Sequence, residues 1–213
     1  MQKARTKVDF AAVEAAAARI APHIRRTPTI LMEHVRDRPV PNPVHIKLEC
    51  LQVTGAFKAR GVTNRLLTTP PEEASRGIVT ASGGNHGLAV ARAGKLAGVA
   101  ATVYLPPSAS PAKRREIARW GVRIEVVGPT WDDADRAAAR YAEREGAVYV
   151  HPFKDPQVVA GQGSNRAATV TALNGSVTDC AVISVRRLPA LLGHRVEACI
   201  AATRCLPLPF VSP

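Results

Sequence analysis

Short apolar runs alternate with longer segments of helical periodicity between residues 45 and 150 of this chain. The runs predict strands over residues 45–50, 77–81, 101–105, 123–127 and 147–150. The segments between them predict helices over residues 58–67, 85–96, 111–120 and 132–145. Strands and helices that alternate in this way are typical of repeated βαβ units. The pattern therefore predicts an α/β fold with a parallel sheet, whose ligands bind beyond the carboxyl ends of the strands.

The amino-terminal region precedes this alternation and follows a different pattern. Asp9 is a good N-cap for a helix over residues 10–23, in which apolar positions recur at helical spacing. Thr27 and Pro28 then favour an extended conformation, because the residue before a proline is disfavoured in a helix. The segment that follows, up to Pro43, is expected to be a loop with short elements.

The composition is that of a globular protein, with 46% hydrophobic and 22% charged residues among 213. Aromatic residues make up only 4%, so we expect a core of Ala, Val, Leu and Ile. The net charge of +12 raises the question of nucleic-acid binding. The basic residues are scattered, however, and no run of five or more occurs. The sequence therefore predicts no nucleic-acid partner.

Cysteine usage and hydropathy predict a cytoplasmic protein. The four cysteines show no CxxC spacing, which favours reduced thiols over a disulfide framework or a metal site. Charged residues interrupt the apolar amino-terminal stretch, so it does not resemble a signal peptide. No stretch approaches the roughly 18 apolar residues of a membrane span, and we expect no membrane partner.

Lys58 stands at the entrance of a predicted helix, after a strand-like run and the turn at Gly55. Poor solvation and a helix N-terminus both disfavour an ammonium ion, so we expect the pKa of Lys58 to be lowered. A neutral lysine amine is a nucleophile towards carbonyl groups, including the aldehyde of pyridoxal phosphate. The alternative is a solvated lysine in an ordinary loop-to-helix turn.

A second candidate stretch, residues 80–87, lies between a predicted strand and a predicted helix. Its glycines allow backbone N–H groups to point at an anion, and the helix N-terminus adds positive potential. Ser82, Asn85 and His86 offer side-chain donors at the same turn, which would suit a carboxylate or a phenolic oxygen. The alternative is an ordinary glycine-rich turn. The stretch is neither a dinucleotide fingerprint nor a P-loop.

A third stretch runs from His151 to Pro156 and leads to the glycines at 161 and 163. Because His151 follows a predicted strand, it is expected at the same sheet edge, although a lone histidine there is more often structural. No HExxH motif or His/Cys cluster with metal spacing occurs, so no metal site is predicted. The absence of GxSxG argues against the common hydrolase nucleophile.

These three stretches, in this order, resemble the threonine/serine dehydratase branch of the fold-type-II pyridoxal-phosphate enzymes, which also holds serine racemases. The resemblance rests on residues 47–61, 82–87 and 151–163 and covers roughly residues 10–164. It implies a tryptophan synthase β-like fold with open parallel sheets and flanking helices. It also implies pyridoxal 5'-phosphate as cofactor and a homodimer or higher homo-oligomer. The substrate would be L-threonine or L-serine, converted to a 2-oxo acid and ammonia, or racemised.

The resemblance assigns expected roles to individual residues. Lys58 would bond to the cofactor aldehyde and move the Cα proton, and Phe57 would pack against the cofactor ring. Asn85 would hydrogen-bond the phenolic oxygen. The substrate carboxylate would lie against Ser82, Gly83, Asn85 and His86. Ala56 departs from the family pattern, which usually has serine there, and this departure should be tolerated.

The resemblance also implies two interleaved domains. Residues 1–65 and 151–213 would belong to a large cofactor domain, and residues 66–150 to a small α/β domain. Residues 165–213 form an atypical tail, short of large apolar residues at first and rich in proline at the end. A further strand is predicted over residues 181–185.

The tail departs from the family where the cofactor phosphate should be held. Family members carry a run of glycines after a strand, whereas Arg186 and Arg187 follow the strand predicted here. Family members also extend well beyond this length. We therefore expect a truncated chain whose large domain is incomplete and whose reading frame is shifted after about Ser164. A coding DNA with no glycine run near position 186 in either other frame would contradict the shift. A non-catalytic remnant remains an alternative to an active enzyme.

Overall fold

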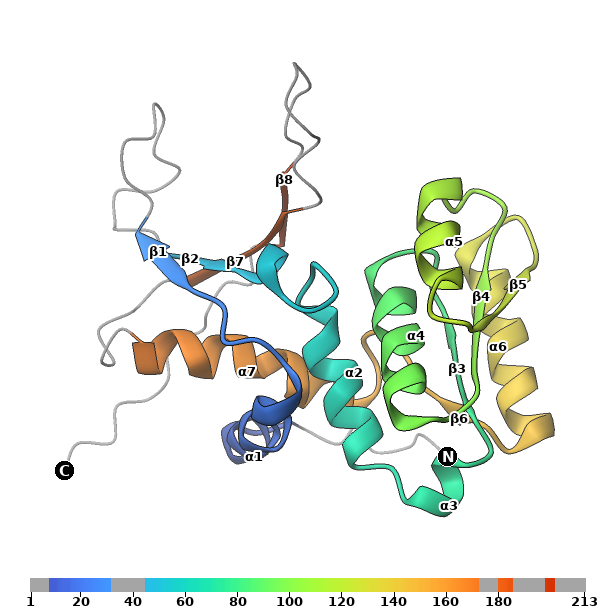
Figure 1. Ribbon diagram of the computed structural model, residues 1–213, viewed down its shortest axis with the longest axis horizontal. Coiled ribbons are helices and arrows are strands. Elements are labelled where there is room, and N and C mark those ends of the chain that lie inside the picture. The colour runs from blue at the N-terminus through green and yellow to red at the C-terminus, as the bar shows by residue number, and fades with distance from the viewer. Residues whose placement is uncertain (1–7, 32–44, 173–179, 186–197, 202–213) are drawn as a thin grey trace.

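The computed structural model describes residues 8–31, 45–172, 180–185 and 198–201, with side chains described up to residue 165. Its strands form two four-stranded sheets (Figure 1). One sheet has the order β1-β2-β7-β8, with strands Thr29–Leu31, His45–Leu48, Cys180–Val185 and Ala198–Ala201. The other has the order β5-β4-β3-β6, with strands Arg123–Val126, Ala101–Leu105, Ile78–Ala81 and Val148–Tyr149.

Seven α-helices are present in the described residues, and they flank the two sheets (Figure 1). They are α1 (Phe10–Ile20), α2 (Lys58–Leu67), α3 (Pro71–Ala74), α4 (Asn85–Ala97), α5 (Pro111–Ala118), α6 (Trp131–Glu145) and α7 (Pro156–Ala172). Short 3-10 helices cover Ala21–His23 and Glu49–Leu51. In the chain as described, the β5-β4-β3-β6 sheet and its helices form one side, and the other sheet with α1 and α7 forms the opposite side.

The β5-β4-β3-β6 sheet is parallel throughout, as the alternation of strands and helices predicted. Ile78 of β3 pairs with Ala101 of β4 on one side and with Val148 of β6 on the other. The β1-β2-β7-β8 sheet is mixed instead: β2 and β7 are parallel, while β1 and β8 add antiparallel strands. The α/β fold with a parallel sheet and flanking helices is therefore confirmed. The boundaries of the two interleaved domains stay a prediction.

The core consists of aliphatic side chains on both faces of the parallel sheet. On one face, α4 and α5 pack Leu88, Ala91 and Ile117 against β4. On the other face, α6 packs Ala134 and Ala138 against β3 and β4. A third cluster joins the sheet to helices α2, α4 and α7. Burying these side chains supplies the main driving force for this arrangement.

The predicted elements agree with the structure except near the chain ends. Helix α2 and strand β4 have the predicted bounds, and most others differ by one or two residues. The predicted strand over residues 45–50 ends at Leu48, where a 3-10 turn begins. Helix α1 is capped by Asp9 as predicted, but it buries Ala16 and leaves Phe10 46% exposed. The sequence did not predict β1, α3, α7 or β8.

Helix α7 crosses α2 closely because glycines face each other at the contact. A Cβ built on Gly161 would lie 2.7 Å from Asn64 Cβ and 2.8 Å from Gly61 Cα. A Cβ built on Gly61 would lie 2.5 Å from the carbonyl oxygen of Val158. No larger residue fits either position unless the two helix backbones separate.

We predict that Gly161→Ala destabilises the protein by about 1–3 kcal/mol, because overpacking outweighs the gain of about 1 kcal/mol in helix propensity. Gly163→Ala is the matched control in the same helix. Its Cβ would meet only the side chain of Val13 of α1, at 2.8 Å from Cγ2, whereas the Cβ at position 161 would meet the backbone of α2. Urea unfolding followed by circular dichroism measures both variants. A Gly161→Ala protein that is as stable as Gly163→Ala would contradict this account of the crossing.

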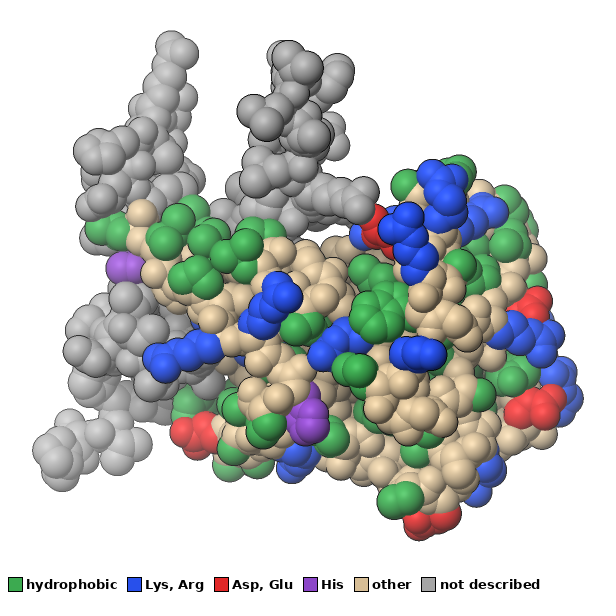
Figure 2. Space-filling view, in the orientation of Figure 1, with side chains coloured by type: hydrophobic (Ala, Val, Ile, Leu, Met, Phe, Trp, Pro, Cys, Tyr) green, Lys and Arg blue, Asp and Glu red, His purple; other side chains and the backbone are tan. Residues whose placement is uncertain are grey.

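Charged side chains are dispersed over the surface. Figure 2 shows lysine and arginine side chains spread across the visible face and interspersed with acidic and neutral ones. Exposed ion pairs such as Arg136–Asp133 and Arg144–Glu145 lie among them. Across the described ranges, no helix is both long and apolar enough to cross a membrane.

Candidate active site

The topology of the parallel sheet marks one edge as the place for a ligand. The chain runs from β3 outward to β4 and β5, and then returns to place β6 on the other side of β3. The strand order therefore reverses its direction at β3, and ligands of open α/β sheets bind beyond the carboxyl ends of the strands at such a point. Residues 82–87 follow β3 and residues 151–155 follow β6. We call these segments the α4 turn and the crossover turn.

Lys58 is the first residue of α2 and extends towards the crossover turn. Its Nζ donates a hydrogen bond of 2.9 Å to the carbonyl oxygen of Pro152 and lies 5.1 Å from the centroid of the Phe57 ring. Phe57 is the N-cap residue of the helix and provides no side-chain cap. The lysine side chain is half-buried, and burial lowers the pKa of its amine. The predicted direction of the shift is confirmed, and a lowered pKa increases the nucleophilic neutral fraction.

A buried polar network anchors the helix that carries Lys58. Arg60 makes a bidentate ion pair with Glu49, with Nε–Oε2 and Nη2–Oε1 distances of 2.8 Å. Thr27 donates to Glu49 over 2.6 Å, and Lys47 donates to the Thr27 carbonyl. Arg60 also reaches Ser164 Oγ of α7 at 3.3 Å. Glu49 is 0% and Arg60 3% exposed, so water screens this pair very little.

The α4 turn is shaped by close packing of its glycines. A Cβ on Gly83 would lie 2.5 Å from Ala109 Cβ, and one on Gly87 would lie 2.3 Å from the carbonyl oxygen of Ser82. Gly84 is the N-cap of α4, which has no side-chain cap, and its amide donates to Ser82 Oγ at 3.2 Å. The first N–H groups of a helix have no partner within that helix. The turn therefore offers backbone donors and a positive helix end to an anion.

His86 is buried behind this turn, and its ring contacts the residue that follows strand β6. Its Nε2 lies 3.0 Å from the carbonyl oxygen of Val150. Burial lowers the pKa of His86 to about 3, and the nearby charge of Lys58 acts in the same direction, so the ring is neutral. A carbonyl only accepts, so Nε2 carries the proton and Nδ1 is left as an acceptor. Because this N–H is engaged by Val150, any contact of His86 with an anion must come from its backbone.

The three stretches of the sequence are joined through the backbone of residues 150–152. The carbonyl of Val150 accepts from His86, and the carbonyl of Pro152 accepts from Lys58. Two residues of chain span at most about 7 Å, so the lysine amine and the histidine ring are held close to one another. Asn85 is the first residue of α4 and is half-buried beside His86.

Sequence reasoning missed two parts of this site. The acceptors on Val150 and Pro152 are backbone atoms, which no residue type reveals. The Glu49–Arg60 pair had a weak signal, because an acidic residue ended a predicted apolar strand at the sheet edge. Charged residues are seldom fully buried unless they are paired, so a buried Glu49 implies a basic partner.

Comparison with known proteins identifies the family of this chain. The sequence matches the family described as pyridoxal-phosphate dependent enzyme over residues 20–187. It is 39% identical over 155 residues to an L-threonine ammonia-lyase of Geobacter sulfurreducens, covering 73% of this chain and 38% of that protein. It is 37% identical over 156 residues to a serine racemase of Oryza sativa subsp. indica, covering 73% and 46%.

A solved structure gives the same result. The structure of maize serine racemase superposes with a TM-score of 0.73 at 33% identity, covering 78% of this chain and 50% of that one. The chain thus spans about half the length of the relatives it matches, or less. The match over residues 20–187 and the shared fold show that the chain belongs to the family of pyridoxal-phosphate dependent enzymes.

Proposed function

We propose that this chain belongs to an ammonia-lyase that converts L-threonine or L-serine to the corresponding 2-oxo acid and ammonia. The observation that carries the proposal is the half-buried amine of Lys58, held on the Pro152 carbonyl at the sheet edge that also holds the α4 turn. An amine with a lowered pKa is suited both to bond to a carbonyl and to accept a proton. The similar ammonia-lyase of Geobacter sulfurreducens supports this reaction class.

The described residues fit pyridoxal phosphate at its aldehyde and ring. Lys58 would hold the aldehyde carbon, Phe57 would pack beside the ring, and Asn85 would donate to the phenolic oxygen. The fit is supported by the amine of Lys58 beside the Phe57 ring and by open space at Gly84, where a built Cβ would have no atom within 4 Å. When bound, the cofactor supplies an electron sink that stabilises negative charge at the substrate Cα. Arg186 and Arg187 lie outside the described ranges.

The residues of the chain itself would perform the proton transfer and hold the substrate. Lys58, as a neutral amine, would take the Cα proton of the amino acid. The β-hydroxyl then leaves as water, and addition of water releases ammonia from the carbon that carried it. Ser82, Gly83, Asn85 and the His86 backbone would hold the carboxylate at the α4 N-terminus. Fixing base and Cα–H together removes much of the entropic barrier.

A serine or amino-acid racemase is a second candidate function. It is favoured by one observation, that the serine racemase relative is nearly as similar as the ammonia-lyase, at 37% against 39% identity. Removal of the Cα proton is common to both reactions, so Lys58 and the α4 turn would serve either one. The two differ in whether the β-hydroxyl leaves or a proton returns to Cα.

The test supplies the 213-residue chain with pyridoxal phosphate and either L-threonine or L-serine, and measures 2-oxo acid, ammonia and the D-enantiomer. We expect 2-oxo acid and ammonia in equal amounts. A product dominated by D-serine would favour the racemase. Neither product, together with no cofactor retained after gel filtration, would favour a non-catalytic remnant. Homo-oligomer formation, which the family resemblance implies, stays a prediction that analytical ultracentrifugation tests.

A further inference from the structure

The crossover turn accepts a hydrogen bond from the candidate lysine on a backbone atom. Lys58 Nζ donates to the Pro152 carbonyl, and the side-chain Nε2 of Gln162 lies 3.5 Å from the same oxygen. Pro152 has no N–H and a ring that fixes its φ angle, so the direction of its carbonyl depends on how the turn around it is held. The position of the lysine amine therefore depends on what shapes residues 151–155.

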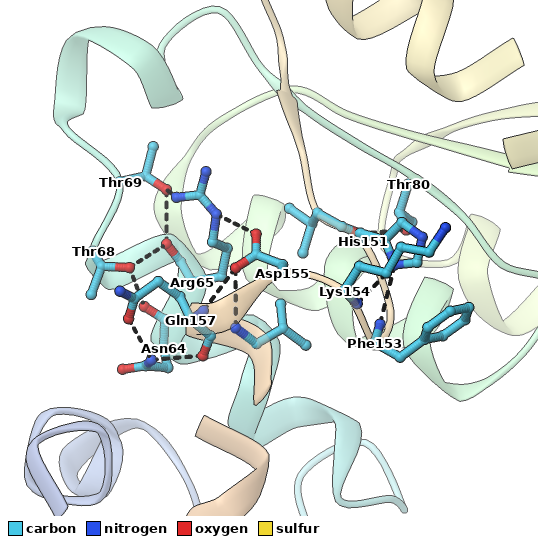
Figure 3. Close-up of polar contacts among 12 residues, drawn as sticks. Asn64, Arg65, Thr68, Thr69, Thr80, His151, Phe153, Lys154, Asp155 and Gln157 are labelled. Atoms are coloured by element: carbon cyan, nitrogen blue, oxygen red, sulfur yellow. Dashed lines mark hydrogen bonds and ion pairs between the residues drawn. The ribbon is translucent and has the colours of Figure 1, made fainter. Parts of the chain in front are cut away.

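His151 shapes this turn by accepting two backbone hydrogen bonds on one ring nitrogen. The N–H groups of Phe153 and Lys154 point at its Nδ1, at 3.2 Å and 3.1 Å (Figure 3). Side chains of Asn and Asp organise turns in the same way, by accepting from N–H groups two or three residues on. Two donors on Nδ1 require that nitrogen to be unprotonated, so the proton is on Nε2. His151 is 8% exposed, and burial lowers the pKa of its ring, which favours this neutral form.

The far end of the crossover turn is anchored independently of His151. Asp155 pairs with Arg65 of α2 at 2.7 Å and caps α7 by accepting from the N–H of Gln157 at 2.8 Å (Figure 3). At the near end, Val150 is tied to His86 and to Thr80. The ends are thus fixed on both sides, and the path of residues 151–154 between them is set by the histidine ring.

We propose that His151 is a positioning residue for Lys58, acting through the turn that presents the Pro152 carbonyl to the lysine amine. The effect of this positioning on catalysis rests on the proposed function, in which Lys58 is the nucleophile. The contact itself exists in the chain without cofactor. No direct hydrogen bond between His151 and Lys58 is part of the proposal.

Packing is the competing role for this histidine. Its ring lies edge-on to Phe153, Tyr149 and Trp131, with centroid distances of 4.5, 5.7 and 6.1 Å. Its Nε2 also faces Asp135 at 3.9 Å. A pair of isosteric substitutions separates the two roles. Asparagine places an acceptor oxygen on the same Cγ as Nδ1, whereas leucine has the same size and no acceptor, and both lose the ring.

The experiment compares His151→Asn and His151→Leu in the full chain without cofactor. Each protein is reductively methylated with formaldehyde and borohydride across a range of pH, and labelling of the peptide that contains Lys58 is followed by mass spectrometry. In the wild type we expect the midpoint of labelling to lie below that of the same peptide in the urea-unfolded chain. In His151→Leu the amine leaves its half-buried position, so the midpoint should rise by at least about half a pH unit, a threefold change in the neutral fraction. His151→Asn should keep the wild-type midpoint.

Two outcomes would overturn the proposal. One is a labelling midpoint in His151→Leu equal to that of the wild type, and the other is a midpoint in His151→Asn shifted as far as that in His151→Leu. If His151→Leu does not fold, as judged by circular dichroism, His151→Ala takes its place, because it also lacks the acceptor and adds no bulk. Faster hydrogen exchange at Phe153 and Lys154 in the Leu variant than in the Asn variant is expected as well. Failure of the lyase assay leaves these measurements unaffected, so the two proposals fail separately.

Discussion

Replacing Lys58 with alanine is expected to remove both covalent cofactor attachment and ammonia-lyase activity. The variant has no amine at the first residue of α2 and no base beside the α4 turn. We expect activity to fall at least about a thousandfold, within the range for loss of a general base. After borohydride reduction and proteolysis, mass spectrometry should find cofactor mass on the Lys58 peptide of the wild type only.

Lys58→Arg is the matched control for this experiment. Arginine keeps a long cationic side chain that is able to reach the Pro152 carbonyl, but it is always protonated and offers no neutral amine. It should preserve stability and still lose attachment and activity. Cofactor mass recovered equally on the peptide with Lys154, or activity retained in either variant, would show that Lys58 does not have the assigned role.

Breaking the buried ion pair between Glu49 and Arg60 is expected to cause the largest loss of stability in the protein. Glu49→Ala leaves a guanidinium that is 3% exposed without its carboxylate. An uncompensated buried charge of this kind costs about 3–5 kcal/mol, a large part of the stability of a typical domain. The free energy of unfolding in urea measures the change.

A double variant and an exposed pair serve as controls for this prediction. Glu49→Leu combined with Arg60→Leu removes both charges and should be more stable than Glu49→Ala, because no charge is left unpaired. Glu125→Ala removes an exposed partner of Arg123 and should leave the urea midpoint unchanged. A Glu49→Ala protein as stable as Glu125→Ala would mean that water reaches Arg60.

The sequence predicted the parallel sheet well, for a physical reason. Strands β3 and β4 are buried on both faces, so they appear as continuous apolar runs. Lys58 and Asn85 are the first residues of helices that follow glycine-containing turns, and such turns are visible in the local sequence. Family membership and the cofactor then followed from three ordered motifs, and both are confirmed by the comparisons.

Helix α7 could not be predicted because its sequence argues against a helix. Gly161 and Gly163 lower helix propensity by about 1 kcal/mol each, and Gly161 is required by its contact with α2, which lies far away in the sequence. Tertiary packing overrides local preference there. The same holds for β1, which has three residues and forms by pairing with β2.

The carboxyl-terminal strand that was expected over residues 181–185 is present. It is β7, which pairs in parallel with β2, and the family match continues to residue 187. The shift of reading frame after about Ser164 stays a prediction, and the coding DNA is its test.

The contact between Lys58 and Pro152 joins residues 94 positions apart, and the one between His86 and Val150 joins residues 64 apart. Closing loops of this length is slow, because chain entropy is lost before the contacts form. During synthesis at about 5–20 residues per second, Lys58 leaves the ribosome several seconds before the turn that receives it. The lowered pKa of this lysine is therefore acquired late in folding, and a nascent or partly folded chain carries Lys58 as an ordinary surface amine.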